Sequence, residues 1–298
     1  MSRTSSPSTQ KPYGVARVSS VWGLARSSFY AARDRQQHPR ELHKRGPKKF
    51  PSDQELVAEI RQLLAEPLFT GEGYRKIWAR LRHKNVRTSK DRVLRLLRQH
   101  QLLSPSRRPD PVRANPHEGT IVTEAPNQMW GTDATATFTD ADGAITVFAA
   151  IDHCTAECVG IHAVKKATRF EALEPIRQAI HEHFGSFSGG CAAGLRLRHD
   201  HGSVYMSDDF QNEIKFLGIE PSPAFVRQPE GNGCIERFFR TLKEQLLWVR
   251  RFRDLAELHQ ALAEFRSRYN HHWILERLNY RTPAQARQDF QLELQVAA

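Results

Sequence analysis

The sequence predicts an α/β domain preceded by an all-α region. Apolar residues recur at helical spacing up to residue 103, whereas the segment MWGTDATATFT, which begins at Met129, alternates as a β-strand does. Positive charge is also concentrated before this change of periodicity. The 298 residues suffice for two units that each bury a core.

The composition is typical of a globular protein of the cytoplasm. Hydrophobic residues make up 39% and charged residues 26% of the chain. We expect no membrane span and no signal peptide, because no long apolar run occurs and the first ten residues lack an apolar core. The four cysteines form no CxxC pair and the histidines lack finger-like spacing, so we expect reduced thiols and no structural zinc.

The net charge of +11 is unevenly distributed. Residues 1–110 carry 24 Lys and Arg against 9 Asp and Glu, whereas residues 111–298 carry 20 against 24. A basic region of this kind attracts polyphosphate through counterion release, which favours nucleic-acid binding. A solvated basic face or a disordered arm is the alternative interpretation.

Residues 1–52 are predicted to hold a disordered start, a short helix-turn-helix-like segment and a basic linker. The first twelve residues are rich in Ser, Thr and Pro. A helical pattern then begins at Tyr13, Gly23 interrupts it, and Ser27 or Ser28 is placed to cap a second short helix. Residues 34–52 are polar, basic and interrupted by proline, as linkers are.

Residues 53–103 are predicted to form a helical DNA-binding domain of the helix-turn-helix type. Asp53 is expected to cap the first helix, and Thr88 or Ser89 the third. Basic side chains gather on the outer side of the third helix, the helix expected to lie in the major groove. A three-helix bundle with an ordinary basic surface is the alternative. The predicted DNA contacts are Lys90, Arg92, Arg95 and Arg98 of the third helix, and Arg75 and Lys76 of the second.

Residues 104–122 form a proline-rich linker into a domain expected to span residues 123–287, followed by a tail at 288–298. Three strand-like runs at 129–139, 144–152 and 157–164 predict a meander. A helix capped by Thr168, a strand at 195–199, a helix from Asp208, a strand near 223–226 and a long helix at 232–249 follow. This order is that of a ribonuclease-H-like α/β domain.

Three carboxylates fall where this domain can bring them together. Asp133 lies inside the first strand, where an unpaired charge is costly, Asp200 ends the fourth strand, and Glu236 lies on the long helix. Three separate elements can thus offer oxygen ligands to hard cations such as magnesium. Scattered surface acids are the alternative; the competing acids, each with a structural interpretation, are Asp152, Asp208 and Asp209.

Phosphodiester cleavage needs an activated attacking oxygen and a stabilised leaving oxygen. Two cations about 4 Å apart provide both in an in-line displacement. Few protein carboxylates suffice, because magnesium takes its other ligands from water and phosphate. Lys243 lies two helical turns after Glu236, on the same face, and with Arg240 it is predicted to contact DNA phosphate.

At this point the residues resemble the DDE transposases of bacterial insertion elements, which are related to retroviral integrases. The resemblance covers residues 70–285, and 35 residues separate Asp200 from Glu236, the interval characteristic of that family. The segments that carry it, in order, are GYRKIWARLR with RVLRLLR, NQMWGTDATATF, DHGSVYMSDDF, NGCIERFFRTLKEQL and RYNHHWILERLNYRTPAQA.

The resemblance implies an integrase-type catalytic core that uses Asp133, Asp200 and Glu236 with magnesium, for which manganese can substitute. It implies cleavage at element ends, transfer of the freed 3′-hydroxyl to target DNA, and a homo-multimer on paired terminal inverted repeats. It also implies association with the nucleoid and an upstream-frame protein joined by frameshifting. His199, Arg237 and the run Trp273 to Leu275 depart from the commoner pattern, so no DNA role is expected of that last run. Asn232, at the helix entry, is expected to be an N-cap.

Two other functions share these features. A ribonuclease-H-like nuclease would use the same site to hydrolyse DNA without joining it. A DNA-binding repressor or inhibitor would use the basic region and have an inactive core.

Overall fold

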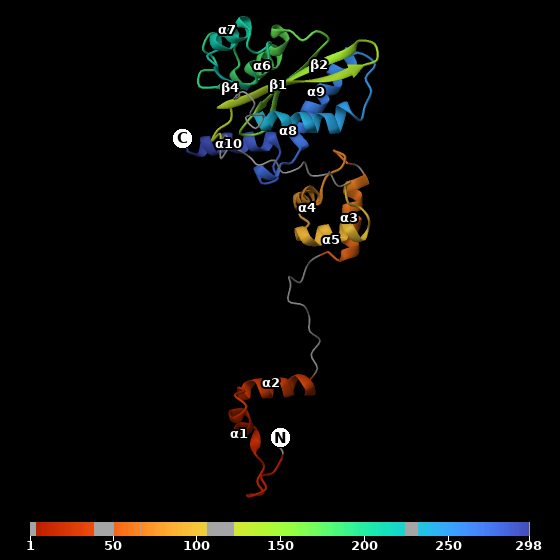
Figure 1. Ribbon diagram of the computed structural model, residues 1–298, viewed down its shortest axis with the longest axis vertical. Coiled ribbons are helices and arrows are strands. Elements are labelled where there is room, and N and C mark those ends of the chain that lie inside the picture. The colour runs from red at the N-terminus through yellow and green to blue at the C-terminus, as the bar shows by residue number, and fades with distance from the viewer. Residues whose placement is uncertain (1–3, 39–50, 66, 106–121, 224–231, 298) are drawn as a thin grey trace. The chain divides into compact units, whose positions relative to one another are not determined.

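The computed structural model describes residues 4–38, 51–65, 67–105, 122–223 and 232–297 (Figure 1). The chain divides into two compact units, Met1–Phe50 and Pro51–Ala298. Most of the expected linker at 104–122 and part of the expected linker at 34–52 lie outside the described residues. No helix in the described ranges combines the length and the apolar character that crossing a bilayer requires.

The first unit contains two short helices, α1 (Gly14–Val21) and α2 (Arg26–Gln37). Ahead of them, where a disordered start is expected, Ser5 and Pro12 form an isolated antiparallel bridge. The prediction that Ser27 or Ser28 caps the second helix is wrong, because α2 starts before both residues. Its N-cap residue is Ala25, which makes no side-chain hydrogen bond.

The second unit begins with three helices, α3 (Asp53–Ala65), α4 (Tyr74–His83) and α5 (Lys90–Gln99). Ser89 caps α5 as predicted, since its side chain accepts a hydrogen bond from the Arg92 amide. The predicted capping role of Asp53 is wrong. Ser52 and Glu55 instead exchange hydrogen bonds in a capping box. The helices enclose a separate apolar core, formed by Leu56, Val57, Ile60, Ile77, Leu81, Val93, Leu96 and Leu97.

The strands of the described residues form one five-stranded sheet in the order β3-β2-β1-β4-β5. β1 (Met129–Thr139), β2 (Gly143–Asp152) and β3 (Cys158–Val164) are antiparallel neighbours, as the meander predicts. β4 (Arg196–His199) runs parallel to β1, and β5 (Glu220–Pro223) runs parallel to β4. This topology confirms the predicted ribonuclease-H-like fold class.

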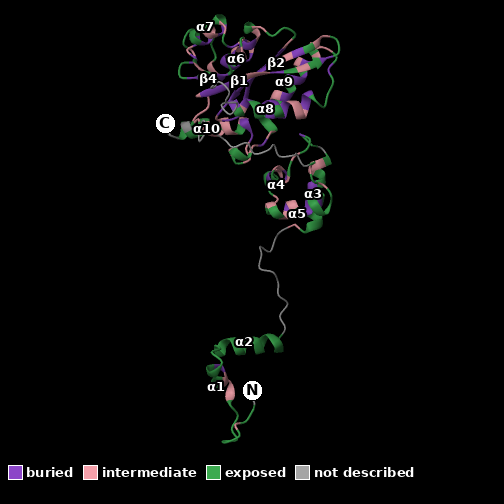
Figure 2. Ribbon diagram, viewed as in Figure 1, coloured by how far each residue is buried: buried purple, intermediate pink, exposed green. Residues whose placement is uncertain are grey.

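Helices cover both faces of the sheet, and Figure 2 shows the buried residues concentrated between them. α6 (Arg169–Phe184) and α7 (Asp208–Phe216) pack with Trp130 and Phe148 on one face. α8 (Gly233–Leu242) and α9 (Leu255–His272) pack with Val147 and Ala149 on the other. α10 (Pro283–Ala297) follows the short 3-10 helix Glu276–Leu278.

Three expected boundaries differ from the structure. β5 ends at Pro223, where the expected strand begins, and residues 224–226 lie outside the described ranges. The expected long helix is α8 followed by a π-helix, Lys243–Leu247. The expected tail at 288–298 is largely helical, because α10 extends through it to Ala297.

Gly160 lets α6 approach the edge strand closely. A Cβ at Gly160 would overlap the backbone carbonyl of Pro175, which lies inside α6. Because the obstacle is backbone, no side-chain rotation can relieve the overlap.

We expect Gly160→Ala to lower the free energy of unfolding by about 2 kcal/mol or more, because overpacking displaces α6 from β3. Gly73→Ala is the control, since Gly73 has a negative φ and nothing within 4 Å of an added Cβ. That control should change stability by less than about 1 kcal/mol. Equal urea midpoints for the two variants would contradict the close approach.

Candidate active site

Asp133 projects from the face of β1 that α8 covers. Consecutive strand residues point to opposite faces. Trp130 and Ala134 pack with the α6 and α7 layer, so Asp133 lies on the other face, opposite Ala149 of β2. Its carboxylate accepts a hydrogen bond from the Ala134 amide at 2.8 Å. The first predicted acid is therefore at mid-sheet, partly buried.

Asp200 follows β4 directly and is held by a tight turn. The Gly202 amide donates a hydrogen bond to Asp200 Oδ1 at 2.8 Å. A Cβ at Gly202 would lie 2.9 Å from that same oxygen, so only glycine leaves the carboxylate undisturbed. The next residues form a turn that leads to Tyr205, a buried ring packed between Phe148 and Phe210.

Glu236 lies in the first turn of α8, on its exposed side. Asn232 is the N-cap residue of this helix, as expected, but its side chain makes no capping hydrogen bond. Asn232 Nδ2 instead donates to the Thr132 carbonyl at 3.2 Å. That bond fastens the start of α8 to β1 next to Asp133, which positions Glu236 relative to the first acid.

The charges of the other predicted residues reach Asp133 through space. Burial raises the pKa of Asp133 to about 6, and the charges of Asp200 and Glu236 add to the rise. The Ala134 amide and the charge of Lys243 oppose it. Desolvation also raises the pKa of Glu236. Two acids and one lysine that are far from Asp133 in the sequence therefore influence its charge state.

The three carboxylates are too far apart to share a single ion. Among the described residues, the group of potential ligands whose atoms all lie within 4.8 Å of one another consists of Glu157, Glu182 and His183. A pair of ions about 4 Å apart would accept a wider set of ligands. The hard oxygen donors and their mutual repulsion fit such a pair of divalent cations.

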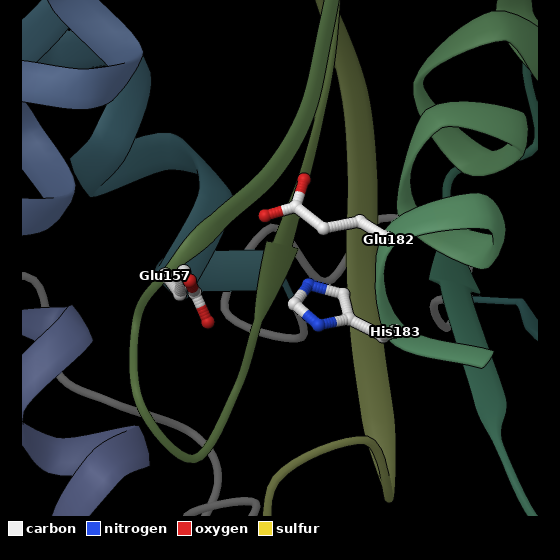
Figure 3. A group of neighbouring side chains, drawn as sticks. All are labelled: Glu157, Glu182 and His183. Carbon is white, nitrogen blue, oxygen red and sulfur yellow. The ribbon is translucent and has the colours of Figure 1, made fainter. Parts of the chain in front are cut away.

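The Glu157, Glu182 and His183 cluster, which the sequence did not suggest, is shown in Figure 3. Its two carboxylates already have cationic partners, because Arg287 donates to Glu157 and Arg266 donates to Glu182. An added divalent ion would face both guanidinium groups at short range. We therefore interpret the cluster as an ion-pair network.

The competing acids have the structural roles that were expected. Asp152 is fully buried and accepts hydrogen bonds from the Asn127 amide and from the amide and hydroxyl of Thr155. Asp208 and Asp209 lie in the first turn of α7, where negative charge is favourable.

Two predicted DNA contacts of α5 are engaged within the helical domain. Arg92 Nε and Arg95 Nη2 each donate to Asp53 at 2.8 Å. Arg92 also donates to the Pro51 carbonyl. These residues therefore join α5 to the start of α3, whereas Arg98 is exposed near the end of α5.

Other predicted DNA contacts also have protein partners. Arg75 Nη1 donates to Glu276 at 2.8 Å, and the Lys90 ammonium lies 4.0 Å from the same carboxylate. Lys76 lies over the ring of Trp273. Lys243 begins the π-helix, and Arg240 donates to Glu244.

The terminal segment packs against α4. The Tyr280 ring meets Trp78 edge-on at 5.4 Å, its hydroxyl donates to Glu276, and Pro283 is buried.

Known sequence families match most of the second unit. The integrase core domain matches residues 123–229, a further integrase core domain matches residues 217–283, and an HTH-like domain matches residues 51–110. The chain contains an integrase core domain. Its helical region before the core is the HTH-like domain, which agrees with the predicted fold class.

Transposases of bacterial insertion elements are similar to the chain over most of its length. Transposase InsD for insertion element IS2A/D/F/H/I/K, from Escherichia coli, is 26% identical over 78% of this chain and 77% of the transposase. InsD for insertion element IS2-9, from Escherichia coli strain K12, is 26% identical over 78% and 76%. The predicted kinship with insertion-element transposases is confirmed.

Solved retroviral structures are also similar. A chain of the simian T-cell lymphotropic virus intasome in complex with PP2A regulatory subunit B56 gamma is 21% identical, with a TM-score of 0.48 over 77% of this chain and 74% of that chain. The HTLV-2 integrase catalytic core domain in complex with magnesium is 20% identical, with a TM-score of 0.42 over 55% and 98%.

Sequence reasoning did not single out His153, whose ring lies over Gly131 beside the start of α8. A Cβ at Gly131 would lie 2.8 Å from both His153 Nε2 and Asn232 Oδ1. Burial lowers the pKa of His153 to about 4, while Asp152 opposes this shift. The imidazole is therefore neutral at pH 7. The sequence signal that could have revealed this close packing is Gly131, because a glycine inside a strand often marks a close approach.

We expect acid to destabilise the protein partly through His153. Below the unfolded-state pKa of about 6.5 the unfolded chain binds a proton that the folded chain excludes, so this contribution to stability is lost as the pH falls from 6.5 towards 4. Between pH 7 and pH 5 the loss is about 2 kcal/mol. Urea unfolding of His153→Gln should lack this part of the pH dependence, whereas His181→Gln, at an exposed histidine, should retain it. Parallel pH profiles for wild type and His153→Gln would refute this.

Proposed function

We propose that this protein is a DNA transposase that cleaves the ends of an insertion element and joins the freed 3′-hydroxyl to target DNA. The observation that carries the proposal is that Asp133, on the central strand of an integrase-core sheet, is reached by the charges of Asp200, Glu236 and Lys243. The similarity to InsD transposases supports it.

Asp133, Asp200 and Glu236 are the residues that would hold two divalent cations, magnesium or manganese. When bound, these ions would activate the attacking oxygen and stabilise the leaving oxygen. Burial and the charges of Asp200 and Glu236 raise the pKa of Asp133, so a bound cation would stabilise its carboxylate.

The chain's other residues position the acids and the DNA. Gly202 orients the Asp200 carboxylate through its amide, and Asn232 fixes the start of the helix that carries Glu236. Lys243 brings a fixed positive charge close enough to Asp133 to affect its pKa, which suits a contact with the DNA phosphate next to the reacting bond. Arg240, exposed on α8, extends this basic surface.

The proposal includes the assembly that the reaction needs. Two element ends must meet, which favours a homo-multimer bound to paired terminal inverted repeats. An upstream-frame protein fused by frameshifting is a further proposed partner, and association with the nucleoid follows from the DNA substrate.

A nuclease would share the site but yield nicks without joined products. A repressor with an inactive core would bind DNA and yield neither, although all three acids are present.

We expect Asp133→Asn, Asp200→Asn and Glu236→Gln each to reduce cleavage and joining at least about a hundredfold, because each change removes a negative cation ligand. DNA affinity should stay within about threefold, since phosphate contacts elsewhere supply most of the binding. Asp208→Asn, which neutralises an exposed acid of α7, is the matched control and should keep wild-type activity. Metal-dependent joining by any of the three variants would rule out this site.

Asp53 would compete with DNA phosphate for Arg92 and Arg95, because it forms ion pairs with both. If Arg92 and Arg95 contact phosphate, Asp53→Asn should release both and tighten binding of an element-end duplex about threefold or more, with a steeper salt dependence. Arg95→Ala should lower the salt slope by about one. Glu59→Gln, which alters an acid of the same helix paired with Lys84, is the control and should leave the salt slope unchanged. Weaker binding by Asp53→Asn would mean that the arginines serve only to hold α3.

A further inference from the structure

The first unit has the geometry of a helix-turn-helix, although the HTH-like family match begins only at residue 51. Four residues, Trp22 to Ala25, separate α1 from α2, and the two helices meet at a corner (Figure 1). A turn of three or four residues with a glycine is characteristic of this motif. Gly23 supplies the glycine, with a φ of 65°.

The turn between the helices is closed by specific hydrogen bonds. The Leu24 amide donates to the Ser19 carbonyl at 2.9 Å, and the Gly23 amide donates to the Ser20 carbonyl at 3.3 Å. This pair forms a Schellman motif, which needs the left-handed backbone of Gly23. The corner is therefore set by backbone bonding.

Small and apolar residues occupy the inside of the corner. Ser19 is buried, and Val15 and Val18 on the same helix are half-buried. On α2, Phe29 is less exposed than Tyr30, at 38% against 53%. A small residue at the closest approach of two helices, flanked by apolar ones, allows the second helix to cross the first closely.

The outer side of α2 is suited to duplex DNA. Ser27 and Ala31 lie on the opposite side of the helix from Phe29, and Tyr30 and Arg26 flank them; all four are exposed. Residues 4–38 contain five Lys or Arg and a single acid, Asp34. In a helix-turn-helix the early residues of the second helix reach the base edges, while positive charge around them contacts phosphate.

We propose that α1 and α2 form a second DNA-reading module, in which α2 enters the major groove and Ser27 and Tyr30 face the bases. This inference rests on DNA as the substrate, as in the proposed function, but not on the catalytic site. The excess of positive charge in residues 4–38 favours a polyanion, although Val21, Trp22 and Leu24 expose apolar surface around the turn. A transposase with two such modules reads a longer terminal repeat than the HTH-like domain alone can cover.

The test uses the full-length protein and two duplex probes of equal length: the terminal repeat that flanks the gene, and mixed-sequence DNA. Ser27→Asp adds a negative charge at the proposed groove-facing position, where an acid in the first helical turn stabilises the helix. Ser8→Asp, the control, adds the same charge outside the helices. Arg26→Gln and Lys11→Gln form a second matched pair that removes one positive charge each.

On the terminal-repeat probe, we expect the wild type to protect two separate segments from hydroxyl radicals. Ser27→Asp should lose one of them and bind roughly tenfold more weakly, because its carboxylate faces DNA, whereas Ser8→Asp should stay within about twofold. Arg26→Gln should weaken binding more than Lys11→Gln. Identical footprints for Ser27→Asp and Ser8→Asp would overturn the module. So would an effect of Ser27→Asp on oligomer mass without an effect on the footprint, which would indicate contact between copies.

The same reactions separate this inference from the catalytic proposal. Asp133→Asn should keep both protected segments and fail to join DNA, whereas Ser27→Asp should join DNA at saturating concentrations of the terminal-repeat probe. Joining by Asp133→Asn would reject the catalytic site and leave the module standing.

Discussion

The register of β1 against β2 is the constraint on which the site depends. Asp133 pairs with Ala149, which sends its carboxylate to the α8 face and Trp130 to the α6 and α7 face. A slip of one residue would exchange the faces of every side chain in β1. The fully buried Trp130 would then leave the apolar core beneath α6 and α7, where it contacts Phe184. The Asp133 carboxylate would take a place in that core. Hydrophobic packing on one face thus determines the position of a charge on the other.

This arrangement has an electrostatic cost that the fold accepts. Holding Asp133 partly buried among two further acids favours its protonated form and raises its pKa. A protein that needed only stability would place an apolar residue there. Divalent cations, bound as proposed, would offset this cost, and the repulsion among the acids would then favour cation binding. Asn232 and Gly202 matter because they keep two of the acids in place while they repel one another.

The sequence predicts well those features that depend on local signals. The strands β1 to β3 follow from alternation, and Thr168 and Ser89 cap their helices because each precedes an apolar helical run. It also places the three candidate acids within β1, directly after β4 and on α8, as the structure has them, while their catalytic role stays a prediction. The sequence does not reveal Asp53 as the partner of Arg92 and Arg95, because 39 and 42 residues separate them and nothing local marks the pairing.

Long-range contacts also explain why the net charge of the chain is a poor measure of the positive charge that is free to contact DNA. β3 is an edge strand, and its outward-facing polar groups must be satisfied to prevent pairing with other chains. Arg266 donates to the carbonyls of Cys158 and Val159, and Asn270 and Gln178 accept from amides of the same strand. Arg287 is likewise committed to Glu157. Some arginines of the catalytic domain thus hydrogen-bond to the edge of the sheet. A count of positive residues therefore includes side chains that stabilise the fold as well as any that contact DNA. Exposed positive charge is therefore the better sign of a DNA contact, and in the first unit four of the five basic residues at 4–38 lie exposed on α1 and α2.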